Sequence, residues 1–556
     1  MERKYYLKEI LLILIVAFYS LLLVNILKYH LTIIYHPYQL EQDELGMVLS
    51  TDLLLKGGNP YDFANQPMYI NIYGIAYNYV VISVHKVISL MYSNNSATLI
   101  LSHRMTSGIF IIFSVMLLII VMRRLNFNYI YIYGAALIQY AAFMVNTTPI
   151  IRPDSFGTFM YLLSIIIPWR YNYTIFSILF SILFSLLGFY SKVYFIMGIC
   201  VVLSYIFIYI SKLRAMLYFL LFGLIFLISV LVMNTFYESY FYNVLLLQFN
   251  QLPYNFGVMI KQSWMFVLCN IALVAYLLIA MYYLFLKDYA EAVYNFFSGF
   301  SANINILDLR EPLYRNKVSI FSYAAFTTLC ALQLKLACNS GAWMSYYFQL
   351  FLPFFLVYVL GVKIKTFKSN FLLILLLTVT VYTNYSFGLF TNRTGSLQLP
   401  VASLTEDPTT RLKTKQSHDF WEDMSELIKK HNNVLVSKPF NFLVFNNGQR
   451  VYDSGFNNYY DKVITKNKLL KKIFPMEFSD LHKSFLNDID SKISRKHFDL
   501  LILTHANDTG FRYLQPWFIL NKTVFDNYAV VGSYRYTADD YILKGTIDFL
   551  ILTPMR

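Results

Sequence analysis

Long hydrophobic runs occupy most of the chain up to residue 390, and polar residues become frequent only from about residue 391 onward. A helix that crosses a bilayer needs roughly 20 consecutive apolar residues. This pattern predicts a mostly α-helical, polytopic transmembrane domain over residues 1–390. Runs near the required length lie at 7–27, 103–122, 128–147, 155–169, 172–190, 193–211, 215–234, 263–286, 318–337, 344–362 and 369–389.

A further apolar stretch, 70–92, is ambiguous because it carries two asparagines, His85 and Lys86. Cytoplasmic loops of membrane proteins carry an excess of Lys and Arg. If 70–92 stays on the outer side as an interfacial or re-entrant segment, all the basic clusters lie in the cytoplasm together with the N-terminus. If 70–92 crosses the membrane, every later loop changes sides and these clusters lie outside. We therefore expect eleven spans and a large first outer loop at 28–102. The clusters are Arg3 with Lys4 and Lys8, Arg123-Arg124, Arg170, Lys212 with Arg214, the loop 287–317, and Lys363-Lys365-Lys368.

Residues 391–556 combine one amphipathic helical pattern, at 420–430, with short strand-like runs. Alternating helices and strands of this kind predict a small α/β domain. The eleven-span topology makes this domain extracytoplasmic. The strand-like runs are 433–436, 442–445, 500–503, 530–532 and 549–552.

Composition agrees with an integral, multi-pass membrane protein. Hydrophobic residues make up 57% of the chain and charged residues 14%, against about a quarter charged in soluble proteins. The formal net charge is +14, but the basic residues gather in loops on one side, so no nucleic-acid partner is expected. The four cysteines lie in or beside hydrophobic runs, which predicts neither a disulfide framework nor a CxxC metal site.

Acidic residues are scarce in the membrane domain, and a carboxylate near the membrane is a functional candidate by default. The pair Asp43-Glu44 stands directly before a segment, 45–56, with helical spacing of apolar residues. Two interpretations stay open on the residues alone. The pair either begins that helix as a favourable acidic N-terminus or takes part in chemistry.

Three elements follow one another here: the acidic pair, the turn Gly57-Gly58-Asn59-Pro60-Tyr61, and the segment Tyr73-Gly74-Ile75-Ala76-Tyr77. This order resembles the first outer loop of the GT-C superfamily of membrane glycosyltransferases, in particular the protein O-mannosyltransferase and lipid A aminoarabinose transferase group. The resemblance implies transfer of a sugar, with inversion, from a polyprenyl-phosphate donor to a lipid, glycan or protein acceptor. It further implies a bacterial-type cytoplasmic membrane, with Asp43 as the general base and Glu44 as an accessory group.

The leaving phosphate needs fixed positive charge, and the candidates are Arg152, Lys192, Arg104 and Lys86. Arg152-Pro153-Asp154 resembles an Arg-Pro-Asp element of the aminoarabinose transferase branch. Lys192 stands where that branch has a Thr-Lys-Gly element, with Val193 in place of the glycine. The alternatives are a local ion pair for the tripeptide and a lysine that snorkels at a helix end.

Residues 346–353 resemble a helix start of the same family, with Tyr346 where a basic residue is usual. The resemblance makes Tyr346 and Tyr347 donor-binding residues, together with Asp154, Tyr61 and Tyr73.

No cofactor is assigned, and no His or Cys cluster has metal-binding spacing. Asp43 and Asp154 together would suit a divalent metal ion, as in the oligosaccharyltransferase branch. This metal site is the alternative interpretation of the two carboxylates. Catalysis in the monophosphate-donor branch does not depend on such an ion.

Two other functions remain open. A ligase or polymerase that uses a lipid-pyrophosphate-linked glycan should have a smaller first outer loop and a large, basic late loop. A lipid-linked sugar transporter or flippase should have broken helices and paired charges at mid-membrane, and few ionisable residues lie at mid-span here.

Overall fold

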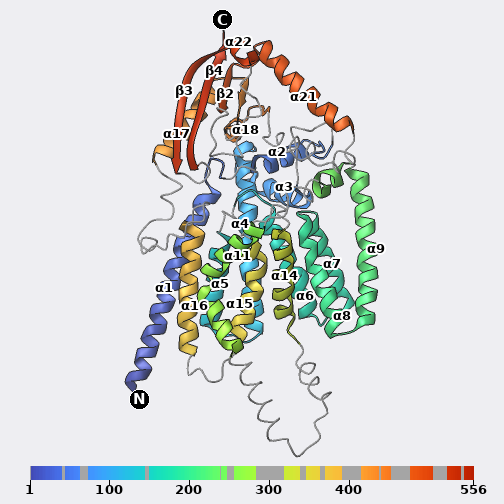
Figure 1. Cartoon of the computed structure of the whole chain (residues 1–556), viewed down its shortest axis with the longest axis vertical. Helices are drawn as coiled ribbons and strands as arrows, with labels where there is room; N and C mark the ends of the chain where they lie inside the picture. Colours follow the sequence, from blue (N-terminus) through green and yellow to red (C-terminus); the bar gives the residue numbers. More distant parts are fainter. Residues whose placement is uncertain are drawn as a thin grey trace, which may run out of the picture.

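The computed structural model is mostly helical, with a small sheet near the C-terminus (Figure 1). It describes residues 2–40, 44–62, 73–144, 150–237, 239–246, 256–282, 318–337, 346–362, 370–390, 415–437, 440–452, 476–504, 522–539 and 544–555. Asp43 and Glu41, as well as the basic loops 287–317 and 363–368, lie outside these residues.

Among the described residues, three helices are long and apolar enough to cross a membrane: α1 (Glu2–Ile34), α4 (Ser96–Arg124) and α9 (Lys212–Phe236). A fourth candidate combines α11 (Phe256–Cys269) with a helix at Ile271–Tyr282, and the pair bends by 88° at its break. The remaining apolar runs form shorter helices. The helical state of the predicted runs is therefore confirmed where the structure describes them, and an eleven-span crossing of a membrane stays a prediction. These helices are α5 (Tyr129–Phe143), α6 (Asp154–Arg170), α7 (Ile175–Phe189), η2 (Val193–Ile196) with α8 (Met197–Tyr209), α14 (Ile320–Ala337), η5 (Tyr347–Phe351) with α15 (Leu352–Gly361), and α16 (Asn370–Phe390).

Two short helices of the first loop, α2 (Glu44–Leu55) and α3 (Ala76–Ile88), lie between the long helices and the sheet (Figure 1). The predicted 45–56 helix is therefore confirmed. α3 has 13 residues and is about 20 Å long at 1.5 Å per residue. It is shorter than the ~30 Å hydrocarbon core of a bilayer, which is consistent with leaving 70–92 out of the span count.

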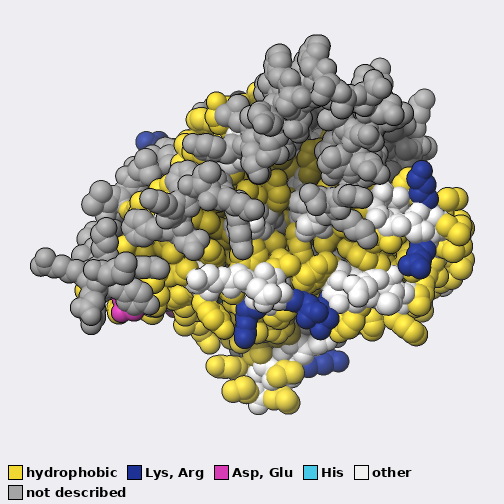
Figure 2. All heavy atoms as spheres, turned by 90° about the horizontal axis from the view of Figure 1, so that it is seen from below, with side chains coloured by type: hydrophobic (Ala, Val, Ile, Leu, Met, Phe, Trp, Pro, Cys, Tyr) yellow, Lys and Arg dark blue, Asp and Glu magenta, His cyan; other side chains and the backbone are white. Residues whose placement is uncertain are grey.

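The end of the helical bundle opposite to the sheet is basic. Figure 2 looks at this end and shows Lys and Arg side chains among hydrophobic ones, with few acidic groups in view. The N-terminus lies at the same end (Figure 1). Exposed basic residues that end α4 and α6 or begin α9 are Arg123, Arg124, Arg170, Lys212 and Arg214.

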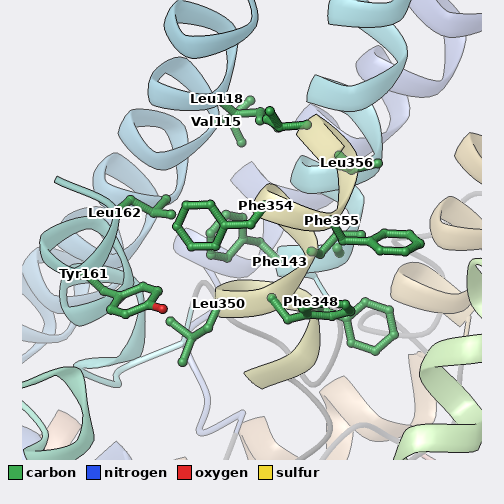
Figure 3. Packing of buried hydrophobic residues seen from close by; sticks show 14 of the residues in the cluster. Val115, Leu118, Phe143, Tyr161, Leu162, Phe348, Leu350, Phe354, Phe355 and Leu356 are labelled. Atoms are coloured by element: carbon green, nitrogen blue, oxygen red, sulfur yellow. The ribbon is translucent and has the colours of Figure 1, made fainter. Parts of the chain in front are cut away.

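Aromatic residues of η5 and α15 fill the centre of the bundle (Figure 3). The Phe354 ring meets Tyr161 of α6 edge-on, with 6.0 Å between ring centroids. Phe143 of α5 lies close to Phe354 and Phe355 and is fully buried (Figure 3). Because these contacts join helices from the first and last parts of the membrane domain, η5 and α15 are held in a fixed position relative to α6.

The C-terminal part contains a four-stranded sheet with the order β1-β2-β4-β3. β1 (Val434–Val436) is parallel to β2 (Leu500–Thr504), and β4 (Lys544–Pro554) is antiparallel to both β2 and β3 (Tyr528–Asp539). The predicted helix at 420–430 corresponds to α17 (Lys415–Lys429), and α21 (Met476–Ser494) and α22 (Lys522–Asn527) complete the α/β unit.

The predicted strand at 442–445 is wrong, because these residues belong to the helix α18 (Asn441–Asn446). All four side chains are buried. A short run that is apolar on every side has no periodicity that separates a strand from a helix.

The sheet domain shares one hydrophobic core with the first-loop helices. This core contains Tyr38, Leu45 and Tyr77 from the first loop together with Trp421 and Phe442 from the tail. The Trp421 ring stacks on Tyr38 with 6.0 Å between centroids. The tail is therefore packed onto the membrane domain and not tethered beside it.

We expect Phe442→Ala to destabilise the whole chain, because Phe442 is fully buried in this shared core. Loss of a buried Phe side chain costs about 3–5 kcal/mol. Far-UV circular dichroism during thermal unfolding should show a lower midpoint for the helical bundle as well as for the tail. Val531→Ala is the control, because Val531 of β3 is 60% exposed. A bundle transition unchanged by Phe442→Ala would mean that the two parts fold independently.

Candidate functional site

A buried ion pair lies where the first loop meets α4. Arg104 and Glu44 have fully buried side chains, and Arg104 Nη2 is 3.1 Å from Glu44 Oε2. Arg104 Nε also donates to Glu44 Oε1 at 3.4 Å. The remaining guanidinium donors bind the carbonyls of Ile33 (3.4 Å), His36 and Tyr38 (2.7 Å). All five N–H donors of Arg104 are therefore used within the protein.

The oxygens of the Glu44 carboxylate are also fully occupied by hydrogen bonds within the protein. Besides Arg104 the carboxylate accepts the backbone N–H of Leu40 at 2.7 Å and that of Ile151 at 3.1 Å. Neither Glu44 as an accessory catalytic group nor Arg104 as a donor-phosphate ligand fits this arrangement, because no donor or acceptor is left for a substrate. We assign both a structural role. Asp43 precedes Glu44 in the sequence but lies outside the described residues, so its predicted role as base stays a prediction.

Close to Ile151, a second pair joins Asp154 and Lys192. Lys192 Nζ donates to Asp154 Oδ1 at 2.8 Å and to Tyr346 Oη at 2.6 Å. Tyr194 Oη also donates to Asp154 Oδ1, at 2.9 Å. Asp154 is 5% and Lys192 6% exposed, and Asp154 Oδ2 has no hydrogen-bond partner among the described residues.

Three tyrosine rings surround the Lys192 amino group, which lies 5.0 Å from the ring centroid of Tyr73, 5.5 Å from that of Tyr194 and 5.1 Å from that of Tyr346. Aromatic faces attract an ammonium group without neutralising its charge. A second amino group shares two of these rings, since Lys335 Nζ lies 3.4 Å from the Tyr194 centroid and 4.9 Å from the Tyr346 centroid. We call these six residues (Tyr73, Asp154, Lys192, Tyr194, Lys335 and Tyr346) the tyrosine–lysine cluster.

The cluster is assembled at helix ends. Asp154 begins α6, Lys192 lies between α7 and η2, Lys335 is in the last turn of α14, and Tyr346 precedes η5. η5 is a π-helix, a widened turn that often marks functional sites. Hydrogen bonding between Ser107 of α4 and Ser155 (2.9 Å) fixes the start of α6.

Gly74 explains how Tyr73 reaches the cluster. Its N–H donates to the Ser191 carbonyl at 2.9 Å, and the N–H of Ala76 donates to the Tyr190 carbonyl at 2.8 Å. A Cβ at position 74 would lie 2.0 Å from the Tyr190 oxygen. Only glycine permits this close backbone approach, so the Tyr73-Gly74 motif holds the first loop against the segment that carries Lys192.

Charge interactions within the cluster outweigh the effect of burial. Burial by itself would raise the pKa of the Asp154 carboxyl, but the positive charges of Lys192 and Arg152 hold that pKa below its ordinary value. Burial by itself would lower the pKa of Lys192, but Asp154 raises it. Both groups are therefore ionised at neutral pH.

The other predicted site residues lie at varying distances from the cluster. Arg152 is half-buried and close enough to influence the charges of Asp154 and Lys192. Tyr61 is one step removed, since its hydroxyl donates to the Tyr73 carbonyl at 2.7 Å. The Tyr347 hydroxyl instead bonds Ser263 of α11, at 2.9 Å. Lys86 is exposed near the far end of α3, about 15 Å along the helix from Ala76.

Two residues of the cluster, Tyr194 and Lys335, were missed from sequence. Lys335 carried a usable signal, because a single lysine within an apolar helix is a functional candidate. Tyr194 carried none, because the chain contains 48 tyrosines.

The cluster is suited to binding an anion. It contains two amino groups and one carboxylate in a largely buried site, and charge-assisted hydrogen bonds to phosphate are among the stronger polar contacts. The alternative metal site of Asp43 and Asp154 includes a residue outside the described range, and Asp154 Oδ1 is already bound to Lys192 and Tyr194. No family model, curated protein or solved structure matches this chain.

We expect Arg104→Met to lower the free energy of unfolding by about 3–5 kcal/mol, because it leaves the buried Glu44 charge unpaired. Chemical unfolding of the purified protein measures this loss. The double variant Arg104→Met/Glu44→Leu should recover much of it, since no buried charge then remains. A variant Arg104→Met of normal stability that fails to bind phosphate would instead return Arg104 to the list of substrate ligands.

Proposed function

We propose that this protein is a membrane glycosyltransferase that moves a sugar from a polyprenyl-phosphate donor to an acceptor on the outer face of the membrane, with inversion. The observation that carries the proposal is the tyrosine–lysine cluster, a preformed anion site at helix ends in a chain rich in apolar helices. The resemblance of the first loop to the GT-C superfamily supplies the reaction class.

The chemistry requires a place for the leaving phosphate. As the bond from the anomeric carbon to the phosphate oxygen breaks, negative charge grows on the phosphate, and fixed cations lower the energy of that transition state. Lys192 and Lys335 supply amino groups there, with Arg152 nearby. Their burial strengthens the interaction, because charges attract more strongly away from water.

The acceptor hydroxyl must lose a proton as it attacks, and Asp43 is our proposed base. Its neighbour Glu44 accepts the N–H of Ile151, and Asp154 follows Ile151 by three positions. Glu44, the neighbour of Asp43 in the sequence, is thereby tied to the segment that leads into the cluster. This connection supports a single site formed by the first loop and the start of α6.

We further propose the eleven-span arrangement, with the sheet domain on the outer side. Exposed basic residues at the opposite end of the bundle support it (Figure 2), since cytoplasmic loops are enriched in Lys and Arg. The cluster then lies on the outer side, where a lipid-linked donor presents its head group.

A transporter of lipid-linked sugars is the second candidate, favoured by the 88° break between α11 and the following helix. Broken helices in transporters place freed backbone groups in the substrate path. Here the Cys269 carbonyl at the break accepts hydrogen bonds from the side chains of Thr383 and Asn384 of α16. Because groups of the protein itself bind this carbonyl, the break is better explained as a structural bend than as part of a substrate path. The glycosyltransferase therefore remains our proposal.

We predict that Asp43→Asn lowers sugar transfer by about 10²–10⁴-fold, the usual contribution of a general base, while donor binding stays near that of the unmodified protein. Asn caps a helix as well as Asp does but cannot accept the proton. Transfer from radiolabelled polyprenyl-phosphate sugars measures the effect. Full transfer activity in this variant would remove Asp43 from the mechanism, and consumption of only diphosphate-linked donors would favour the ligase alternative.

We predict opposite sides of the membrane for Leu125, next to Arg123-Arg124, and Val531 in β3. Both side chains are exposed. In a background without the native cysteines, a membrane-impermeant maleimide added to intact cells should label Val531→Cys, and Leu125→Cys only after the cells are opened. The reverse pattern, or equal labelling, would contradict the topology.

A further inference from the structure

Lys335 is the least expected member of the tyrosine–lysine cluster. It comes from the last turn of α14, whereas Lys192 belongs to the loop between α7 and η2. Both amino groups nevertheless lie against the rings of Tyr194 and Tyr346. A lysine that merely snorkels at a helix end extends its amino group into water, whereas this side chain is half-buried on two rings.

The carboxylate of the cluster binds Lys192 and Tyr194 through one of its two oxygens. Asp154 Oδ1 serves Lys192 and Tyr194, and the Tyr346 hydroxyl accepts from Lys192. Two amino groups that share the same rings disfavour each other's charged form, because like charges at short distance repel. An anion that enters between them removes the repulsion and adds two attractions.

We infer that Lys335 is a second phosphate-binding residue, which reaches the head group from α14 while Lys192 binds it from the α7–η2 loop. The inference rests on the proposed function and extends it to a residue outside the first-loop motifs. A phosphate group suits this position, because its several free oxygens accept hydrogen bonds from more than one direction. Tyr194 and Tyr346 hold the two amino groups in place beforehand, which lowers the ordering cost of binding.

The inference predicts how substitutions at Lys335 behave. Lys335→Met removes the charge and keeps the length of the side chain, and the affinity for a phosphate head group should fall about 10- to 100-fold, as for loss of one hydrogen bond to a charged group. Lys335→Arg keeps the charge and should stay within a few-fold of the unmodified protein. Lys212→Met is the matched control, because Lys212 is exposed at the start of α9.

The test is a binding titration of the full chain in neutral detergent with three probes: geranylgeranyl phosphate, geranylgeraniol and inorganic phosphate. The alcohol measures the contribution of the lipid tail alone, and inorganic phosphate shows whether a free anion suffices. We expect a preference for the phosphate over the alcohol in the unmodified, Lys335→Arg and Lys212→Met proteins. Lys335→Met should lose that preference. Lys335→Gln serves as a second neutral variant where Lys335→Met fails to fold, as judged by the thermal unfolding midpoint.

Two contrary results are separable. If Lys192→Met loses the preference while Lys335→Met and Lys335→Gln bind as the unmodified protein does, Lys335 is not a phosphate ligand and the proposed function stands. If the unmodified protein binds phosphate and alcohol equally, the anion site itself is wrong, and the proposed function fails together with the inference.

Discussion

The buried pair of Arg104 and Glu44 is the interaction on which the sheet-facing end of the helical bundle depends. A guanidinium and a carboxylate removed from water cost several kcal/mol each unless every donor and acceptor is satisfied. Here Arg104 uses all five donors on Glu44 and on three carbonyls from the end of α1 and the turn after it. Because these hydrogen bonds require short distances and favourable angles at the same time, the pair constrains the position of α1, α2 and α4 relative to one another.

Backbone hydrogen bonds connect this ion pair and the first loop to the tyrosine–lysine cluster. Glu44 holds Ile151, three positions before Asp154, and the Gly74 backbone holds the first loop against Ser191, next to Lys192. Each connection joins segments that are distant in the sequence. The use of tyrosine around the two lysines has a clear physical consequence, because ring faces stabilise an amino group while leaving its charge available to an incoming anion.

The C-terminal sheet domain also contacts the buried ion pair. Phe442 lies over the Arg104 guanidinium, with its ring centroid 5.8 Å from Arg104 Cζ, and its neighbours belong to the core shared with the first loop. The ring covers the charged pair on the side of the tail and keeps water from competing for its hydrogen bonds. The sheet domain thereby stabilises the first loop directly.

Sequence alone determined the helical character of the apolar runs and singled out Asp154, Lys192, Tyr73 and Tyr346, which the structure brings together in one cluster. These inferences succeed because hydrophobic periodicity and the scarcity of charge are local properties of each segment. Only the tertiary structure decided which charges meet. The partner of Glu44 lies 60 residues away, and Lys335 reaches Tyr194 from a separate helix. The strand predicted at 442–445 is a helix for the same reason: packing on all sides, which no local pattern records, determines its conformation.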